Sequence, residues 1–336
     1  MKLQRLREIL GHATEKRIAV AGDLMLDEFV WGKVGRISPE APVPVVEVSS
    51  ESFYPGGAAN VARNLREFTG SVSVIGTVGT DSRGDRLIDL LREQKIETDL
   101  VLQDPNFPTI VKTRIIARNQ QVVRVDRESI RPPTLDQIDQ ISASVHKIVP
   151  RLDAFIFEDY GKGFLNAQLV RKISQDLANA GKLTTADPNP HAQIDWGSVT
   201  AVKPNRTEAL QAAGMPLHDP VDPPLADTAL LTAGVKLLSV WETQMLLITL
   251  GEEGMLLLER NQPPHHIPTK ARQVFDVSGA GDTAIALFTL ALACQASPLE
   301  AAEIANHASA VVVGKLGTAT VTPAELIASF EDDASA

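Results

Sequence analysis

The chain has 336 residues, of which 44% are hydrophobic, 22% charged and only 4% aromatic. This is the composition of a globular protein, and the length fits one large α/β domain or two smaller ones. The formal net charge of −10 argues against nucleic acid as a partner. The single cysteine, Cys294, excludes a disulfide framework and a cysteine metal site, which fits a reducing cytoplasm. No stretch reaches the roughly 18 apolar residues of a membrane span, so neither membrane insertion nor secretion is expected.

Short apolar runs bounded by turn residues recur along the chain and predict strands. They cover residues 17–21, 72–75, 154–157, 183–186, 201–202 and 245–249. Stretches with helical periodicity lie between several of them, at 85–94, 135–149, 167–180 and 298–313. Strands that alternate with helices indicate βαβ units and a largely parallel sheet, whose ligands bind outside the carboxyl ends of the strands.

Two segments do not follow this alternation. Residues 43–49 alternate partly between apolar and polar side chains, and residues 109–127 predict a hairpin that turns near residues 119–120. Both have the pattern of antiparallel strands outside the main sheet. We therefore expect a small lid made of strands over about 36–50 and 108–127.

The chain contains no internal repeat and no linker long enough to divide it. One domain is expected over residues 1–330, followed by a flexible acidic tail over residues 331–336.

The most informative segment is DVSGAGDT at residues 276–283, which precedes the apolar run 284–296. Its two glycines permit a tight turn with bare amides, and the apolar run predicts a buried helix that begins there. Unpaired amides and the positive end of the helix dipole then converge on one point, which is an anion hole. Asp282 inside this hole suggests a base that accepts a proton from a hydroxyl attacking a phosphate. The alternative is a glycine turn and N-cap at the start of an ordinary core helix.

A second glycine cluster, PGGAAN at residues 55–60, precedes the helix-like residues 61–67. Adjacent glycines allow a ligand to approach the backbone, and Asn60 offers a donor and an acceptor to a sugar hydroxyl. Three further motifs separate the two glycine clusters: GxxGxDxxG at 76–84, NxxE at 205–208 and TLGxxG at 249–254. With these five ordered motifs the chain resembles the ribokinase-like (PfkB) carbohydrate kinases from end to end.

Within that family, several segments are similar to the kinases that phosphorylate D-glycero-D-manno-heptose 7-phosphate at C1, on the ADP-heptose route to lipopolysaccharide. These segments are GDLMLD at 22–27, RISPEAPVPVV at 36–46, KTR at 112–114, ARNQQ at 117–121 and VVGKLGT at 312–318. The resemblance implies an αβα sandwich of three layers with a mostly parallel sheet, a small β-strand lid, and ATP with Mg²⁺ as the phosphoryl donor.

Three alternatives remain open at this point. One is another kinase of the family that acts on an unphosphorylated sugar or a sugar acid, and a second is a non-catalytic sugar-binding protein of the same fold. The third, a nicotinamide-dependent oxidoreductase, is disfavoured because the first predicted strand is followed by GDLM rather than by a three-glycine fingerprint.

The resemblance also implies roles for individual residues. The catalytic base would be Asp282, and the anion hole would be formed by the amides of Gly279, Ala280 and Gly281. The sugar would be bound by Asp27, Gly56, Gly57 and Asn60. The nucleotide side would comprise Asn205, Glu208, Thr249, Gly251, Gly254 and Asn306, with Glu208 organising Mg²⁺ through water. Asn205 and Glu208 also have the spacing of a helix capping box, so both roles are possible for that pair.

Lys112, Arg114 and Arg118 would place three cations on the lid. A substrate that already carries a phosphate needs a cationic clamp, which these residues would supply in a chain of negative net charge. The alternative is that they are solvated charges of an exposed hairpin.

Two positions depart from the heptose kinases. Asn189 stands where a lysine is usual, which would alter a phosphate contact, and His307 stands where a small residue is commoner, which would reshape the adenine pocket.

Exposed hydrophobic lid strands, such as residues 43–46, predict a homodimer through the lids. Because the chain ends near the kinase boundary, a separate nucleotidyltransferase is expected in the pathway.

Overall fold

The computed structural model describes residues 1–118, 120–192, 194–271, 274–315 and 317–334. Its helices are α1 (Leu3–Gly11), α2 (Ala58–Arg66), α3 (Ser82–Glu93), α4 (Leu135–Ile148), α5 (Ala167–Asn179), α6 (Arg206–Ala212), α7 (Thr228–Val240), α8 (Ala280–Ala293), α9 (Pro298–Val313) and α10 (Pro323–Ala334). Its strands are β1 (Arg17–Gly22), β2 (Leu24–Ile37), β3 (Pro44–Gly57), β4 (Ser71–Gly79), β5 (Glu97–Asp104), β6 (Ile110–Ala117), β7 (Gln120–Arg127), β8 (Ala154–Glu158), β9 (Leu183–Asp187), β10 (Ala201–Val202), β11 (Met245–Thr249), β12 (Met255–Glu259) and β13 (His265–Ile267).

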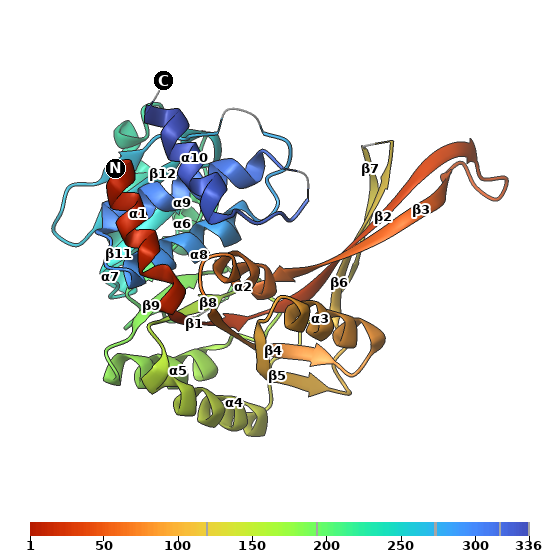
Figure 1. Cartoon of the computed structure of the whole chain (residues 1–336), viewed down its shortest axis with the longest axis horizontal. Helices are drawn as coiled ribbons and strands as arrows, with labels where there is room; N and C mark the ends of the chain where they lie inside the picture. Colours follow the sequence, from red (N-terminus) through yellow and green to blue (C-terminus); the bar gives the residue numbers. More distant parts are fainter. Residues whose placement is uncertain (119, 193, 272–273, 316, 335–336) are drawn as a thin grey trace.

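Nine strands form the main sheet, in the order β13-β12-β11-β10-β9-β8-β1-β4-β5. The pairs from β11 to β5 are parallel, whereas β12 and β13 are added antiparallel at one edge. One face of the sheet packs against α1, α2, α3, α8, α9 and α10, and the other against α4, α5, α6 and α7 (Figure 1). The expected sandwich of three layers is therefore confirmed.

The burial of individual elements follows from their residues. All five residues of β8 are buried, as in a parallel strand covered on both faces by helices. Helix α5 buries Leu169, Ile173 and Leu177 at helical spacing and leaves its other side in solvent. Helix α8 is apolar nearly all round, because it packs between α2 and α9 and against β8 and β9.

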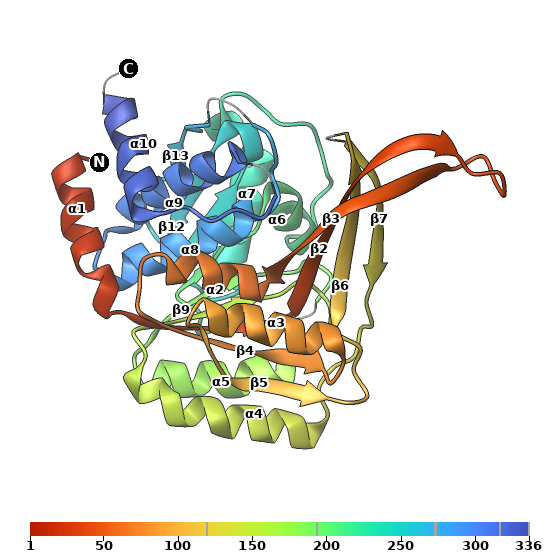
Figure 2. The same ribbon diagram turned by 45° about the vertical axis from the view of Figure 1, so that its right-hand side comes forward.

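A second sheet of four strands, in the order β3-β2-β6-β7, forms the lid and projects from the body of the molecule (Figures 1 and 2). It consists of two antiparallel hairpins joined by parallel pairing of β2 with β6. The lid is larger than the sequence indicates, since β2 starts at Leu24 and β3 continues to Gly57. The first residues of β2 are buried on both faces, so they lack the alternation that marks a lid strand.

The chain after Phe330 differs from the flexible tail that we expected. Helix α10 continues to Ala334, and Glu331 forms an ion pair with Arg7 of α1 at 3.1 Å. The two termini consequently lie on the same side of the molecule (Figure 1). Within the described part of the chain, no helix has both the length and the apolar character needed to cross a bilayer.

Candidate active site

The parallel strands of the main sheet all have their carboxyl ends on the same side, and the first turn of α8 lies there too. Asp282, in this turn, is only 4% exposed. Its carboxylate accepts two hydrogen bonds, from Nδ2 of Asn60 at 2.7 Å and from the hydroxyl of Tyr160 at 2.6 Å. Three distant parts of the chain therefore meet at this carboxylate.

The protonation of Asp282 is set by opposing effects. Burial raises the pKa of this carboxyl to about 6, while the hydrogen bonds from Tyr160 and Asn60 work in the opposite direction. The group is therefore mainly ionised at neutral pH but holds a proton more strongly than an exposed aspartate. These are the properties of a general base.

The turn before α8 has the conformation that an anion hole requires. Gly279, the N-cap residue, has a left-handed backbone with φ of +79°, and a Cβ there would lie 2.7 Å from Nδ2 of Asn60. Only glycine fits this position. The amide of Ala280 bonds to the carbonyl oxygen of Val277 at 3.3 Å, so it is engaged within the turn. The amide of Thr283 bonds to the carbonyl oxygen of Gly279 at 2.9 Å, whereas no backbone partner is found among the described residues for the amides of Gly281 and Asp282.

The residues expected on the sugar side lie at the root of the lid. Asp27 of β2 is buried and accepts a hydrogen bond from Nη1 of Arg114 at 2.5 Å. A Cβ on Gly56 would lie 2.4 Å from Oδ2 of Asp27, which explains the glycine at this position. The neighbouring Gly57 has a positive φ and caps α2.

The placement of Asn60 differs from the expected sugar contact. Its amide nitrogen bonds to Asp282, and its amide oxygen accepts a hydrogen bond from Arg63 at 3.3 Å. Arg63 also donates to the carbonyl oxygen of Thr318 and lies over the ring of Tyr54. Both ends of the amide are thus occupied by protein groups, and the sugar-binding role stays a prediction.

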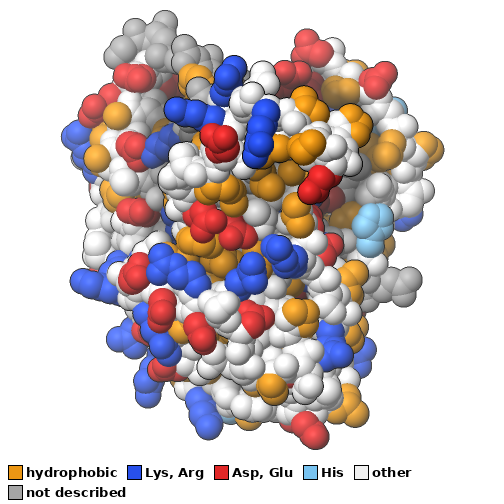
Figure 3. Space-filling view, turned by 90° about the vertical axis from the view of Figure 1, so that its right-hand side faces the viewer, with side chains coloured by type: hydrophobic (Ala, Val, Ile, Leu, Met, Phe, Trp, Pro, Cys, Tyr) orange, Lys and Arg blue, Asp and Glu red, His pale blue; other side chains and the backbone are white. Residues whose placement is uncertain are grey.

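The three lid cations are in different surroundings. Lys112 forms ion pairs with Asp126 at 3.3 Å and Glu128 at 3.4 Å, and Arg114 pairs with Asp27. Arg118 is exposed, with a positive φ of 50°, next to Asn119, which lies outside the described residues. Lys and Arg side chains gather on this face of the molecule, with acidic side chains among them (Figure 3). The structure brings Lys112 and Arg114 toward Asp27 but leaves Arg118 at the hairpin end.

A buried cluster of charges lies below Asp282 at the ends of β8, β9 and β10. Lys203 forms an ion pair with Asp187 at 2.7 Å, and Glu158 is 2% exposed. Burial, together with neighbouring carboxylates, raises the pKa of Glu158 well above its usual range. Burial raises the pKa of Asp187 to about 6, although Lys203 acts against this shift. Each residue of this cluster directly follows a predicted strand, and that position is the signal by which the sequence could have indicated the cluster.

A cavity of about 450 Å³ opens beside the anion hole. It is lined by all four residues expected near the adenine, ribose and phosphates, Thr249, Gly251, Gly254 and Asn306, and also by Ala280 and Gly281. Apolar side chains from α9 and from the loop before α8 form much of the remaining wall. A mostly apolar cavity that ends at free helix amides suits a nucleotide, with the base in the apolar part and the phosphates at the helix.

Asn205 and Glu208 form a complete capping box at the start of α6. The side chain of Asn205 accepts from the amide of Glu208 at 2.9 Å, and Glu208 Oε2 accepts from the amide of Asn205 at 2.7 Å. Asn205 also forms a bridge with Thr249, which lines the cavity. The pair is therefore structural and adjoins the candidate nucleotide site.

The sequence pattern of the pfkB family of carbohydrate kinases matches residues 15–325. The chain belongs to this family. It is 42% identical, over 316 residues, to the bifunctional protein HldE of Desulfatibacillum aliphaticivorans, with 94% of this chain and 63% of that protein covered. The HldE of Helicobacter hepaticus is 40% identical over 311 residues, which cover 93% of this chain and 63% of that protein. The chain thus spans somewhat less than two thirds of the length of these relatives.

Solved structures of other proteins share the fold. Ribokinase of Arabidopsis thaliana, complexed with ribose and ATP, superposes with a TM-score of 0.71 at 18% identity and covers 94% of this chain and 99% of its own. Phosphofructokinase-2 of Escherichia coli, in complex with potassium, gives a TM-score of 0.78 at 18% identity, with coverage of 94% and 98%. These similarities support the architecture of body and lid described above.

The structure shows the surroundings of His307 and Asn189, the two residues that depart from the pattern of the heptose kinases. His307 does not line the nucleotide cavity, because its side chain turns to α10, where Nδ1 lies 2.8 Å from the hydroxyl of Ser329 and the ring stacks on Phe330. The expectation that the side chain of His307 itself reshapes the adenine pocket is therefore wrong. Asn189 accepts a hydrogen bond from the amide of His191 at 2.9 Å and packs against Gly161.

Tyr160, whose hydroxyl bonds to the candidate base Asp282, was not predicted from the sequence. It follows β8 by two residues, at the carboxyl end of a strand predicted correctly, and that position was the available signal. Asp23, grouped with Asp27 in the GDLMLD segment, has a different role. It is 2% exposed and accepts backbone hydrogen bonds from the loop that carries Tyr160.

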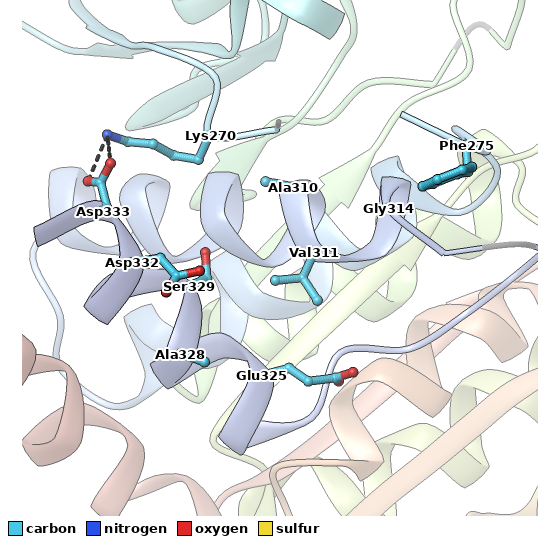
Figure 4. Close-up of a pocket in the computed structure, with 10 residues that line it drawn as sticks. All are labelled: Lys270, Phe275, Ala310, Val311, Gly314, Glu325, Ala328, Ser329, Asp332 and Asp333. Carbon is cyan, nitrogen blue, oxygen red and sulfur yellow. Dashed lines mark hydrogen bonds and ion pairs between the residues drawn. The ribbon is translucent and has the colours of Figure 1, made fainter. Parts of the chain in front are cut away.

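A further cavity of about 540 Å³ lies between α9 and α10 (Figure 4). The ion pair of Lys270 with Asp333, at 2.8 Å, lies at one end and Phe275 at the other (Figure 4). None of the residues expected in the active site lines this cavity, which shares only Ala310 of α9 with the lining of the candidate nucleotide site.

Proposed function

We propose that this protein is an ATP-dependent kinase that phosphorylates the C1 hydroxyl of D-glycero-D-manno-heptose 7-phosphate and forms the 1,7-bisphosphate. The observation that carries the proposal is the position of Asp282. It lies directly after two residues that line the nucleotide cavity and is held, on its other side, by groups near the root of the lid. The choice of the sugar is supported by the similarity to the HldE proteins and by the lid segments shared with heptose kinases.

In the proposed reaction, the sugar lies at the root of the lid with its hydroxyl beside Asp282. The hydroxyl proton passes to the Asp282 carboxylate, the hydroxyl oxygen bonds to the γ-phosphorus, and the bond to the bridging oxygen breaks to release ADP. The amides at the start of α8 stabilise the charge on the phosphoryl oxygens. The lid excludes water, which would otherwise accept the phosphoryl group.

Magnesium would accompany the nucleotide, and the residues near the phosphates fit it. Glu208 uses Oε2 for the capping box, and no hydrogen bond to Oε1 is found among the described residues. Its free carboxylate oxygen suits Mg²⁺, which is usually held by one or two carboxylates, phosphates and water. When bound, it would neutralise phosphate charge.

The phosphate of the sugar would be bound by lid cations. Lys112 and Arg114 lie on β6, which pairs with β2 so that Lys112 is opposite Asp27 and Arg114 is opposite Phe29. These cations lie next to the carboxylate expected to hold the sugar. Their present partners, Asp126, Glu128 and Asp27, would exchange with the phosphate when the substrate binds.

A substrate panel tests the proposed function. ADP release would be measured by a coupled assay with heptose 7-phosphate, ribose and fructose 6-phosphate, and with no acceptor as the control. We expect the highest kcat/KM with heptose 7-phosphate and little ADP release without an acceptor. A clear preference for an unphosphorylated sugar would replace the heptose proposal with a general sugar kinase, and no acceptor-dependent ADP release would remove the kinase proposal.

Two lid variants test the phosphate clamp separately from the sugar site. Lys112→Met and Arg114→Ala each remove a charge-assisted contact of about 1.5–3 kcal/mol, so we expect KM for the phosphosugar to rise about ten- to a hundredfold while KM for ATP is unchanged. Because Arg114 also holds Asp27, only Arg114→Ala should impair binding of an unphosphorylated sugar as well. A normal KM for the phosphosugar in both variants would contradict the clamp.

The proposal extends to the setting of the enzyme. We place it in the cytoplasm, where ATP is available and the lone buried cysteine stays reduced. A nucleotidyltransferase activity would act later in the same pathway. The lids would join two copies into a homodimer.

A further inference from the structure

Tyr160 makes a polar contact through its hydroxyl and an apolar contact through the rest of its side chain. Its hydroxyl donates to Oδ1 of Asp282 at 2.6 Å, opposite the oxygen that Asn60 occupies. Its half-buried side chain packs against the small cluster of Met25, Phe107 and Ile110. Met25 and Ile110 pair with each other at the start of β2 and β6, so this cluster is the root of the lid.

The position of Tyr160 is fixed by the backbone that carries it. Asp23, immediately after β1, accepts hydrogen bonds from the amides of Tyr160, Lys162 and Phe164, each at 3.0 Å. A buried carboxylate that accepts from three alternate amides of one loop holds that loop in one conformation. The loop held by Asp23 therefore fixes the position of the Tyr160 hydroxyl beside Asp282.

We propose that Tyr160 is a positioning residue that orients the Asp282 carboxylate and couples it to the root of the lid. The inference rests on the proposed function, in which Asp282 is the base. A carboxylate oxygen has room for two hydrogen bonds, so the phenol fixes the rotation of Asp282 and leaves a lone pair for the attacking hydroxyl.

The charged groups around Asp282 determine what the loss of the phenol would do. The groups around Asp282 come from several elements: Glu158 from β8, Tyr160 from the loop after it, Asp187 from β9, Lys203 directly after β10, and the neutral Asn60 from α2. Burial raises the pKa of Asp282, and Asp187 adds to this effect, while the phenol, the amide and Lys203 oppose it. Removal of the phenol hydroxyl therefore raises the pKa of the base further.

The test is the pH dependence of kcat in Tyr160→Phe, which keeps the ring against the lid root and removes only the hydroxyl. We expect kcat at neutral pH to fall about ten- to a hundredfold, the range for a hydrogen bond to a charged group. The acidic limb of the profile should move to higher pH, so that part of the loss is recovered in alkaline buffer. KM for ATP should stay the same.

The other tyrosine of the chain supplies the matched control, Tyr54→Phe. The acidic limb of its pH profile should coincide with that of the wild type.

The possible outcomes separate the inference from the proposed function. A loss of kcat that is equal at every pH, or no loss, would overturn the role of Tyr160, provided that Asp282→Asn is inactive in the same assay. An active Asp282→Asn would remove the proposed base and the inference with it. Should Tyr160→Phe give too little active protein for kinetics, ¹³C-carboxyl NMR of the ligand-free variant provides the second readout. The pKa of Asp282 should exceed that of the wild type, and an unchanged value would overturn the inference.

Discussion

Several buried carboxylates lie at the carboxyl ends of the parallel strands or in the first turn of α8. Burial raises the pKa of Asp282 and of Asp187 to about 6 and that of Asp159 to about 7. Each is thus half protonated within a pH unit or so of neutrality, where an exposed aspartate is fully ionised. Such concentrations of shifted groups are typical of active sites.

Replacement of the base is the first prediction at this scale. Asp282→Asn keeps the shape of the side chain and should lower kcat by the roughly 10²–10⁴-fold that a general base contributes, with KM for ATP nearly unchanged. Steady-state kinetics check this, with Asp85→Asn on the exposed start of α3 as the control. Near-normal turnover would show that another group accepts the proton.

The same substitution should change stability in a pH-dependent manner. Because the folded pKa of Asp282 lies above the value of an unfolded aspartate, its contribution to stability is complete below about pH 4 and is lost as the pH rises through about 6. Asp282→Asn removes the buried charge, so the free energy of unfolding should exceed that of the wild type by about 1–3 kcal/mol at pH 8 and by little at pH 4. Urea unfolding at both pH values measures it; a difference that is larger at pH 4 would contradict the sign.

At the scale of elements, helices α4, α6 and α9 each start with a capping box, and two of these boxes can be compared. Asn205 with Glu208 begins α6, and Ser297 with Glu300 begins α9, and both pairs form complete capping boxes. Only the first adjoins the nucleotide cavity, through the bridge between Asn205 and Thr249. Substitutions in the two capping boxes can therefore distinguish a helix-capping role of Asn205 from a role in nucleotide binding.

Asn205→Ala and Ser297→Ala should each cost about 1 kcal/mol of stability through the lost cap. KM for ATP should rise in Asn205→Ala alone. Thermal unfolding and kinetics of both variants provide the measurement. An equal KM for ATP in the two variants would leave Asn205 with a capping role only.

The end of β3 gives a second prediction for an element. A Cβ in Gly56→Ala would press on Oδ2 of Asp27 at 2.4 Å, displacing the carboxylate expected to hold the sugar. We expect KM for the sugar to rise at least tenfold, a loss of about 1.4 kcal/mol in binding. Gly35→Ala in the same lid is the control, since a Cβ there meets nothing within 4 Å. Equal KM values for the two variants would mean that Asp27 does not bind the sugar.

The whole molecule divides the site between a rigid body and a projecting lid. The body supplies the nucleotide cavity and Asp282, while the lid supplies Asp27 and its partner Arg114 (Figure 2). The outer part of the lid exposes apolar side chains, Ile37, Val43 and Val48 of the long hairpin and Val122, Val123 and Val125 of β7. Apolar lid surface of this kind favours association with a second copy.

We therefore expect a homodimer at micromolar concentration by light scattering. Val48→Asp introduces a charge into the exposed apolar part of the long hairpin and should shift the protein to the monomer, whereas Val235→Asp, on the exposed face of α7, should not. A monomeric wild type, or a dimer equally sensitive to Val235→Asp, would contradict association through the lids.

The sequence by itself determined the alternation of strands and helices, the order of the motifs and the start of α8, because local periodicity and glycine turns depend on residues close in the chain. Only the tertiary structure decided which side chains face one another. Asn60 and Asp282 are 222 positions apart, and Tyr160 and Asp282 are 122 apart. Sequence patterns predicted neither the contact of Asn60 with Asp282 nor that of Tyr160, since a hydrogen bond between distant segments follows from how the sheet, the lid and α8 pack together rather than from local propensity.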